Sequence, residues 1–338
     1  MVIKMIQKTN IKYENINGIG IRSGKNAKII TMDKELVKED NMVEINWKKI
    51  EKEDEEIIQH YYDMEPVRVC EFTFANNILW SPFYKIRYAV VEDMLVFLSN
   101  AEETSISFPL GNGNLEKAID TITEYFKGAG KKFKMHLVSP SQFDRLQELY
   151  PGRFQVEYNR DSADYVYESE RLISLAGKKL HGKRNHINRF KEAHPDWTYE
   201  KITDENTQEC LDMAEEWRIQ NGCEEKGPKH DEFCVTLHAL KEREALKLTG
   251  GLIRADGRVV AFTLGEPLGE DMFVVHIEKA FADIQGAYPM INQQFITNEA
   301  SGYRYINREE DTGEEGLRKA KLSYDPAFLM EKGIVTEI

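Results

Sequence analysis

The stretch VVHIEKAFADIQGAYPMINQQF, residues 274–295, combines charged side chains with a predicted strand that ends in a glycine turn before a helix. Alternation along the strand places His276 and Glu278 on one face and Lys279 on the other. Gly286 allows a tight turn, and the helix after it offers unpaired N–H groups and the positive end of its dipole. This combination predicts a site for a phosphate or an oxyanion, with an ordinary strand-to-helix turn as the alternative.

A second group of charged residues follows the next predicted strand, in YINREEDTGEEGLRKAKLSYDP, residues 305–326. The C-terminal ends of strands are where α/β sheets usually hold ligands. The side chains at this end are those of Asn307, Arg308, Glu309, Glu310 and Asp311. The carboxylates suit a substrate ammonium, and Arg308, Arg318 or Lys321 suits a phosphate. Tyr324 suits proton donation to a leaving group, and the alternative for the whole stretch is a solvated charged loop.

Six cations gather in GKKLHGKRNHINRFKEAHPDW, residues 177–197, although the chain is acidic overall. They are Lys178, Lys179, Lys183, Arg184, Arg189 and Lys191, with His181 and His186 among them. Because Lys and Arg neutralise phosphates, the segment predicts a nucleic-acid, polyphosphate or anionic lipid partner. An exposed amphipathic helix with Ile187 and Phe190 facing inward is the plainer interpretation, and the two are compatible.

No metal site is predicted. His230, Cys234 and His238 stand at i, i+4 and i+8 of a predicted helix, but these positions extend about 12 Å along the axis, too far for one tetrahedral ion. The four cysteines are scattered and form no C-x-x-C pair, so they predict reduced thiols rather than a disulfide framework.

Length and charge limit the class of protein. The 338 residues carry a formal net charge of -13, which excludes a general nucleic-acid coat. No apolar run approaches the roughly 20 residues that span a bilayer, and the N-terminus lacks the apolar core of a secretory signal. We therefore expect a soluble, cytoplasmic protein.

The order of predicted elements is the same in both halves: helices, then antiparallel strands, then strand, helix and strand. The antiparallel strands are joined at Glu92–Asp93 in the first half and at Asp256–Gly257 in the second. This order predicts an α/β (α+β) fold of two similar mixed modules, residues 42–160 and 161–338. Residues 1–41 show no sustained period, and we expect them to be a disordered or spurious extension.

Three of these stretches, GKKLHGKRNHINRF, VHIEKAFADIQGAYPMIN and NREEDTGEEGLRKAKLSYDP, together resemble the C-terminal domain of phosphatidylglycerol lysyltransferases and its soluble relatives. The resemblance extends over residues 42–338. It implies two tandem GNAT-like domains with mixed, mainly antiparallel sheets and a cleft in the second domain. It also implies transfer of an aminoacyl group from aminoacyl-tRNA, a co-substrate rather than a bound cofactor, to a lipid head group or small-molecule acceptor.

This chain departs from the related patterns in two ways. Gln285 directly precedes Gly286, whereas the acetyl-CoA signature has two residues between its Arg or Gln and its first glycine. The membrane-spanning half of the lysyltransferases is absent, so membrane contact would be peripheral. A CoA-dependent N-acyltransferase using acetyl-CoA or acyl-CoA, and a non-catalytic module that binds an amino acid or peptide, remain the alternatives.

Roles within the implied aminoacyl transfer follow from these residue types. Glu278 is the expected base or ammonium-binding group, and Lys279 or the N–H groups near Gly286 would hold a phosphate or oxyanion. Tyr324 would protonate the leaving oxygen. The expected substrate-binding side chains, with the last three holding a cationic aminoacyl group, are those of His276, Asn307, Arg308, Glu309, Glu310 and Asp311.

Overall fold

The computed structural model describes residues 43–338, apart from residues 66–67, 102 and 223–226. Residues 42–338 form one compact unit. The expected extension, residues 1–41, and the expected start of the first domain at residue 42 lie outside the described residues. None of the helices in the described part is long and apolar enough to cross a membrane.

The first of two seven-stranded sheets is mainly antiparallel, with β4 and β5 as its parallel pair. Its strands in spatial order are β1 (Lys48–Lys49), β2 (Arg87–Val91), β3 (Met94–Ser99), β4 (Ser105–Ser107), β5 (Lys134–Val138), β14 (Gly333–Glu337) and β6 (Phe154–Tyr158). The helices of this half are α1 (Glu55–Met64), α2 (Phe74–Tyr84), α3 (Leu115–Gly128) and α4 (Pro140–Leu149).

The second sheet repeats this plan, with β11 and β12 as its parallel pair. Its strands in spatial order are β13 (Phe328–Met330), β7 (Asp164–Glu168), β12 (Tyr305–Asn307), β11 (Met272–Ala280), β10 (Arg258–Leu268), β9 (Thr249–Ala255) and β8 (Thr198–Lys201). The helices are α5 (Ser169–Ser174), α6 (His181–Ala193), α7 (Thr207–Gln220), α8 (Pro228–Lys241), α9 (Ala287–Glu299) and α10 (Glu315–Leu322).

Both predicted hairpins are present. Glu92 and Asp93 have φ of 49° and 59° between β2 and β3, and Asp256 and Gly257 have φ of 51° and 73° between β9 and β10. Two central residues with positive φ are typical of the type I′ turn, whose twist matches that of antiparallel strands. Local residue choice therefore determines these two connections.

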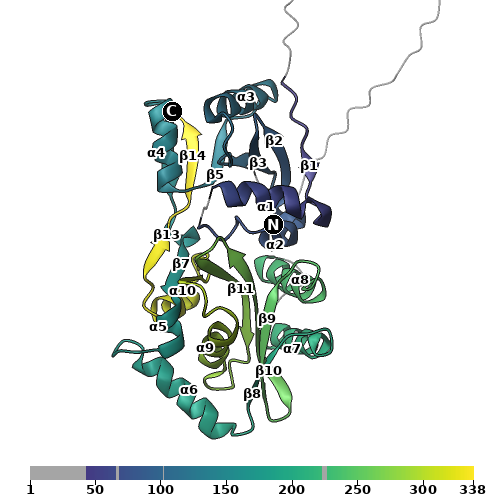
Figure 1. The fold of residues 1–338 in the computed structure, drawn as a ribbon, viewed down its shortest axis with the longest axis vertical. Coiled ribbons are helices and arrows are strands. Elements are labelled where there is room, and N and C mark those ends of the chain that lie inside the picture. Colours follow the sequence, from purple (N-terminus) through teal and green to yellow (C-terminus); the bar gives the residue numbers. More distant parts are fainter. Residues whose placement is uncertain (1–42, 66–67, 102, 223–226) are drawn as a thin grey trace, which may run out of the picture. The chain divides into compact units, whose positions relative to one another are not determined.

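The end of the chain joins the two sheets. After β13 pairs with β7 in the second sheet, β14 enters the first sheet between β5 and β6. Figure 1 shows this strand in yellow beside the teal strand β5. The first sheet is therefore completed by residues that follow all of the second sheet in sequence.

The turn before α9 is fixed by its contact with α6. Gly286 is the residue before α9 and has φ of 90°. A Cβ atom added there would lie 2.3 Å from the carbonyl oxygen of His186. Only glycine fits this position, because a side chain would both strain the backbone and collide with α6. The α9 residues Met290 and Phe295 are buried in the core of this half.

Strands β11 and β12 separate at the point where the charged residues begin. Their parallel pairing ends with Val274 opposite Asn307, and β11 continues to Ala280. A bulge at His276 interrupts the pairing of β11 with β10, since Ile277 faces Leu264 and Val275 faces Gly265. Beyond Val274 and Asn307 the backbones of these two strands no longer pair.

Candidate active site between β11 and β12

Each side chain of the loop that follows β12, residues 308–311, forms an ion pair with a different residue. Arg308 binds Glu278, Glu309 binds His276, Glu310 binds Lys332 and Asp311 binds Arg318. The loop also runs beside β7, where the N–H of Arg308 donates to the carbonyl of Tyr165 and the N–H of Tyr165 donates to the carbonyl of Glu309. The predicted charged loop is therefore an ordered part of the interior rather than a solvated surface.

Glu278 of β11 and Arg308, which follows β12, form a largely buried ion pair. Nη2 of Arg308 lies 2.8 Å from Oε1 of Glu278, and Nδ2 of Asn292, from α9, lies 2.9 Å from Oε2. Both oxygens of the carboxylate therefore accept a hydrogen bond. The Arg308 guanidinium carbon lies 4.8 Å from the centre of the Tyr324 ring and 5.7 Å from that of Tyr167.

Lys183 and Tyr324 lie beside this pair. Nζ of Lys183 is 3.9 Å from the centre of the Tyr324 ring. Burial and the neighbouring charge of Arg308 lower the pKa of Lys183 to about 8. Burial raises the pKa of Tyr324, so this phenol stays protonated at neutral pH. A lysine with a lowered pKa and a protonated phenol thus lie next to one guanidinium.

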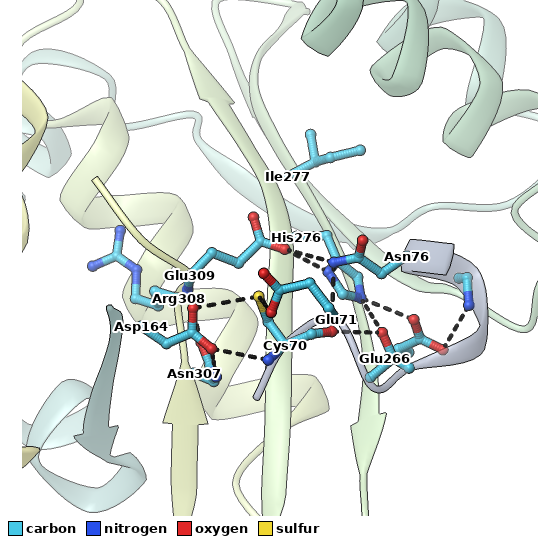
Figure 2. A network of polar contacts seen from close by, with 12 residues as sticks. Cys70, Glu71, Asn76, Asp164, Glu266, His276, Ile277, Asn307, Arg308 and Glu309 are labelled. Atoms are coloured by element: carbon cyan, nitrogen blue, oxygen red, sulfur yellow. Dashed lines mark hydrogen bonds and ion pairs between the residues drawn. The ribbon is translucent and has the colours of Figure 1, made fainter. Parts of the chain in front are cut away.

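His276 is held between two carboxylates (Figure 2). Its Nδ1 lies 2.7 Å from Glu309 and its Nε2 2.9 Å from Glu266, while the hydroxyl of Thr73 is 3.5 Å from Nε2. Burial opposes protonation of His276, but the hydrogen bonds to Glu266 and Glu309 outweigh it and raise the pKa to about 10. His276 is therefore an imidazolium with both nitrogens occupied, and its place in the structure is that of a positioning group.

The ammonium group of Lys332 forms ion pairs with three further carboxylates. Its Nζ lies 2.6 Å from Asp164, 2.7 Å from Glu71 and 3.3 Å from Glu310, and 3.4 Å from the sulfur of Cys70. The potential ligand atoms of Cys70, Glu71 and Asp164 lie within 4.8 Å of one another. An ion would compete there with the buried ammonium of Lys332, which already supplies the positive charge.

Lys321 and Arg318 both make hydrogen bonds to the loop that follows β12. Nζ of Lys321 lies 2.6 Å from the carbonyl of Arg308 and 3.1 Å from that of Glu309, and also binds the carbonyl of Glu310. Arg318 makes hydrogen bonds of 2.9 and 2.7 Å to Asp311, which lower the pKa of that carboxyl. These two cations bind groups within the protein, and the phosphate-binding role predicted for them stays a prediction.

Lys279, Gly286 and Asn307, which were also predicted, make their contacts away from the Glu278–Arg308 pair. Lys279 is on the other face of β11, as alternation predicts, where it binds Glu232 and lies 4.0 Å from the ring centre of Trp217. Gly286 makes its close contact with α6, at the carbonyl of His186. Asn307 is buried and donates to Asp164 over 2.9 Å.

The predicted basic segment divides into inward and outward side chains. Lys183 faces the site, and Arg184 donates to the carbonyls of Leu175 and Gly177. Lys179 is exposed but pairs with Asp325 over 2.8 Å. The exposed side chains that extend along this segment are those of Lys178, Lys179, Arg189 and Lys191. A surface depression of about 330 Å³ is lined in part by His181, Arg184 and Lys191.

Several side chains of the candidate site were not predicted from the sequence. They are Cys70, Glu71, Thr73, Asp164, Glu266, Asn292 and Lys332. Each is a single polar residue within an apolar or mixed stretch, where no spacing marks it. A buried polar residue on the apolar face of α9, such as Asn292, was the one available signal.

Comparison with known proteins places this chain in a family. A conserved protein of unknown function from Bacteroides thetaiotaomicron has a crystal structure with TM-score 0.84 and 40% identity, covering 87% of this chain and 100% of that one. An uncharacterized protein of Mycoplasmoides gallisepticum is 25% identical over 216 residues, 58% of this chain and 68% of the relative.

The structure of L-PGS from Bacillus licheniformis is 13% identical with TM-score 0.58, covering 86% of this chain and 94% of that one, and shares the fold. The expected fold class, tandem GNAT-like modules with mixed and mainly antiparallel sheets, is confirmed. The model of the phosphatidylglycerol lysyltransferase C-terminal family matches residues 65–332. The expected family is thus confirmed, and the chain belongs to the phosphatidylglycerol lysyltransferase C-terminal family.

Proposed function

We propose that this protein transfers an aminoacyl group from aminoacyl-tRNA to a lipid head group or small-molecule acceptor in the cytoplasm. The observation that carries the proposal is the buried Glu278–Arg308 pair at the separation of β11 and β12, flanked by Lys183 and Tyr324. Family membership supports an aminoacyltransferase-type domain. The donor and acceptor are the parts that we add.

The reaction needs three functions that these side chains can supply. An amine or hydroxyl of the acceptor attacks the carbonyl carbon of the aminoacyl ester, and Lys183, when neutral, accepts the proton that the nucleophile loses. Arg308 donates a hydrogen bond to the oxyanion of the tetrahedral intermediate. The bond to the ribose oxygen then breaks, and Tyr324 donates the proton that this oxygen takes up.

The outward cations of α6 and the segment before it suit the tRNA. Lys178, Arg189 and Lys191 are exposed on the same segment that carries Lys183 into the site. Phosphate contacts by such side chains release counterions, so the affinity for tRNA should fall steeply with salt. The chain would otherwise repel nucleic acid, because its formal net charge is -13.

The test compares charged tRNAs with acetyl-CoA as ligands. We expect filter binding of a charged tRNA that weakens between about 50 and 200 mM salt. The double substitution Lys178→Gln with Arg189→Gln should weaken it further, whereas Lys48→Gln with Lys49→Gln, on the exposed edge strand β1, should not. Transfer to a lipid or small-molecule acceptor is then followed with the aminoacyl group radiolabelled.

Two results would contradict the proposal. Thermal stabilisation by acetyl-CoA, with no tRNA binding at either salt concentration, would favour a CoA-dependent N-acyltransferase. Binding of an amino acid or peptide without any product would favour a module that recognises its ligand without turnover.

A further inference from the structure

The connection between α3 and β5 presents three lysines to solvent. Residues 127–132, with the sequence KGAGKK, are all exposed. Lys127 lies in the last turn of α3, where a cation suits the helix C-terminus, but Lys131 and Lys132 follow the helix and have no such reason. Lys131 donates to the hydroxyl of Thr104 over 2.6 Å. Within the described residues, none of the three lysines forms an ion pair with a carboxylate.

The carboxylates on the neighbouring strands are bound to other cations. Glu103, before β4, pairs with Lys134 over 2.5 Å, and Glu337, at the end of β14, pairs with Arg153 over 2.8 Å. The three lysines therefore form a local excess of positive charge on a chain whose formal net charge is -13. Such a chain can approach an anionic surface only through an excess of this kind, because charges beyond about 8–10 Å are largely screened.

Two exposed aliphatic side chains lie at the same edge of the first sheet. Ile338 is 80% exposed and Leu149 is 38% exposed. Thr336 of β14 pairs with Lys134 of β5, so Ile338 and Lys132, each two residues farther along, extend from this edge together. The N–H of Ile338 donates to the carbonyl of Arg153, in the turn that follows α4 and its last residue, Leu149. Figure 1 marks this end of the chain at the tip of β14.

Cations beside exposed aliphatic side chains match the chemistry of a bilayer surface. Lysines bind the phosphates of anionic lipids, and aliphatic side chains enter the boundary between head groups and acyl chains. A nucleic acid would use the lysines and leave both aliphatic side chains in water. The exposed cations that suit tRNA are in another part of the chain, residues 178–191.

We propose that this edge of the first sheet docks on a bilayer that contains anionic lipids. The docking edge consists of Lys127, Lys131, Lys132, Leu149 and Ile338. Its lysines contact lipid phosphates, and its two aliphatic side chains enter the head-group region. The inference goes beyond the proposed function, because it concerns where the protein meets lipid and requires no transfer reaction.

The experiment is flotation of the full chain with lipid vesicles. Vesicles of phosphatidylcholine alone are compared with vesicles that also contain about 30 mol% phosphatidylglycerol. We expect the protein to float with the anionic vesicles only. The bound fraction should fall as the salt concentration rises from about 50 to 200 mM, since screening weakens the contact between lysines and phosphates.

Substitution of the lysines locates the contact. The triple substitution Lys127→Gln, Lys131→Gln and Lys132→Gln should lower the partition coefficient about fivefold per lysine, or about a hundredfold in all. The charge-matched control replaces three exposed lysines of the second half: Lys229→Gln, Lys241→Gln and Lys319→Gln. It should leave vesicle binding unchanged, and the triple substitution at the docking edge should leave tRNA binding unchanged.

The aliphatic side chains distinguish a bilayer from other anionic partners. Ile338→Ser with Leu149→Ser should lower the partition coefficient about three- to tenfold, because less apolar surface leaves water on docking. Ile219→Ser is the matched control, since Ile219 is 67% exposed on α7, and it should bind vesicles as the unaltered protein does.

Four results would each overturn the docking edge. They are no flotation with anionic vesicles, flotation that the triple lysine substitution leaves unchanged, flotation that the two serine substitutions leave unchanged, and a triple variant that loses tRNA binding instead of vesicle binding. The proposed function fails separately. Flotation without aminoacyl transfer would keep the docking edge and remove the reaction, whereas transfer to a soluble acceptor without flotation would do the reverse.

Discussion

Lys183 lies where its protonation state bears on the proposed transfer reaction. It lies beside Arg308 and the ring of Tyr324, partly removed from water, whereas its neighbours Lys178 and Lys179 extend into solvent. A lysine on a basic, exposed-looking segment thus belongs to the interior of the site. The segment that carries Lys183 to Tyr324 thus also carries exposed cations.

We predict that the transfer rate rises with pH up to about 8 and then levels off. The pKa of Lys183 is lowered to about 8, so below that pH the amine is protonated and cannot accept a proton. Lys183→Met should remove this rise and lower the rate about 10²- to 10⁴-fold. The measurement is the single-turnover rate at saturating charged tRNA between about pH 6.5 and 9.5.

Lys48→Met, on strand β1, is the control and should keep the pH profile of the unaltered protein. A Lys183→Met protein that binds tRNA weakly but transfers at the normal saturated rate would return Lys183 to the phosphate-binding role predicted from the sequence. Retention of the rise through pH 8 would assign that titration to another group.

The sequence identified the loop after β12, residues 308–311, as part of a candidate site. It did not identify the side chains that this loop contacts. Arg308 and Glu309 follow a recognisable strand, and strand ends are where ligands gather. Asn292 and Lys332 are isolated polar residues, and their importance depends on which side chain the fold brings opposite them. Single-residue types carry no information about a partner at a long sequence separation.

At the scale of elements, the turn at Gly286 connects β11, α9 and α6. Its φ of 90° and the 2.3 Å approach of the His186 carbonyl leave no space for a Cβ atom. The turn sets where α9 begins, and α9 carries Asn292 to Glu278. Site geometry therefore depends on this one backbone position.

Gly286→Ala should lower the free energy of unfolding by about 3 kcal/mol or more, because the new methyl group meets backbone and adds strain at positive φ. Urea denaturation followed by circular dichroism measures the change. Gly302→Ala is the matched control, since a Cβ there meets nothing within 4 Å and φ is not positive. Equal stability of the two variants would show that α6 can withdraw from the turn.

Strands joined by a turn with a clear sequence signal were predicted correctly. The turns at Glu92–Asp93 and Asp256–Gly257 require positive φ that few residue pairs adopt readily, so they identify their hairpins. The four-residue strand β8 and the pairing of β14 with β5 and β6 had no comparable signal. Pairing between distant segments is determined by the packing of the whole chain, which no local pattern contains.

At the scale of the whole described unit, Lys332 links segments from both sheets. Glu71 precedes α2, Asp164 begins β7 and Glu310 follows β12, and all three surround one buried ammonium. Lys332 itself lies between β13 and β14, where the chain passes from one sheet to the other. One residue thus fixes both the loop after β12 and the path of the last strand.

Lys332→Met should lower the free energy of unfolding by about 3–5 kcal/mol, because three carboxylates would keep their burial and lose their cation. Thermal and urea denaturation would measure it, with the exposed Lys319→Met as the control. Since protonation of the carboxylates relieves their repulsion, the deficit should shrink as the pH is lowered toward 4. A loss below about 1 kcal/mol would show that Lys332 neutralises nothing essential.

The position of β14 also affects the protein while it is being made. Because β14 lies between β5 and β6, the first sheet cannot be completed until residues 333–337 have left the ribosome. At about 5–20 residues per second, β6 waits on the order of ten seconds for its partner strand. The edges of β5 and β6 that pair with β14 are therefore the surfaces that a chaperone would have to protect during translation.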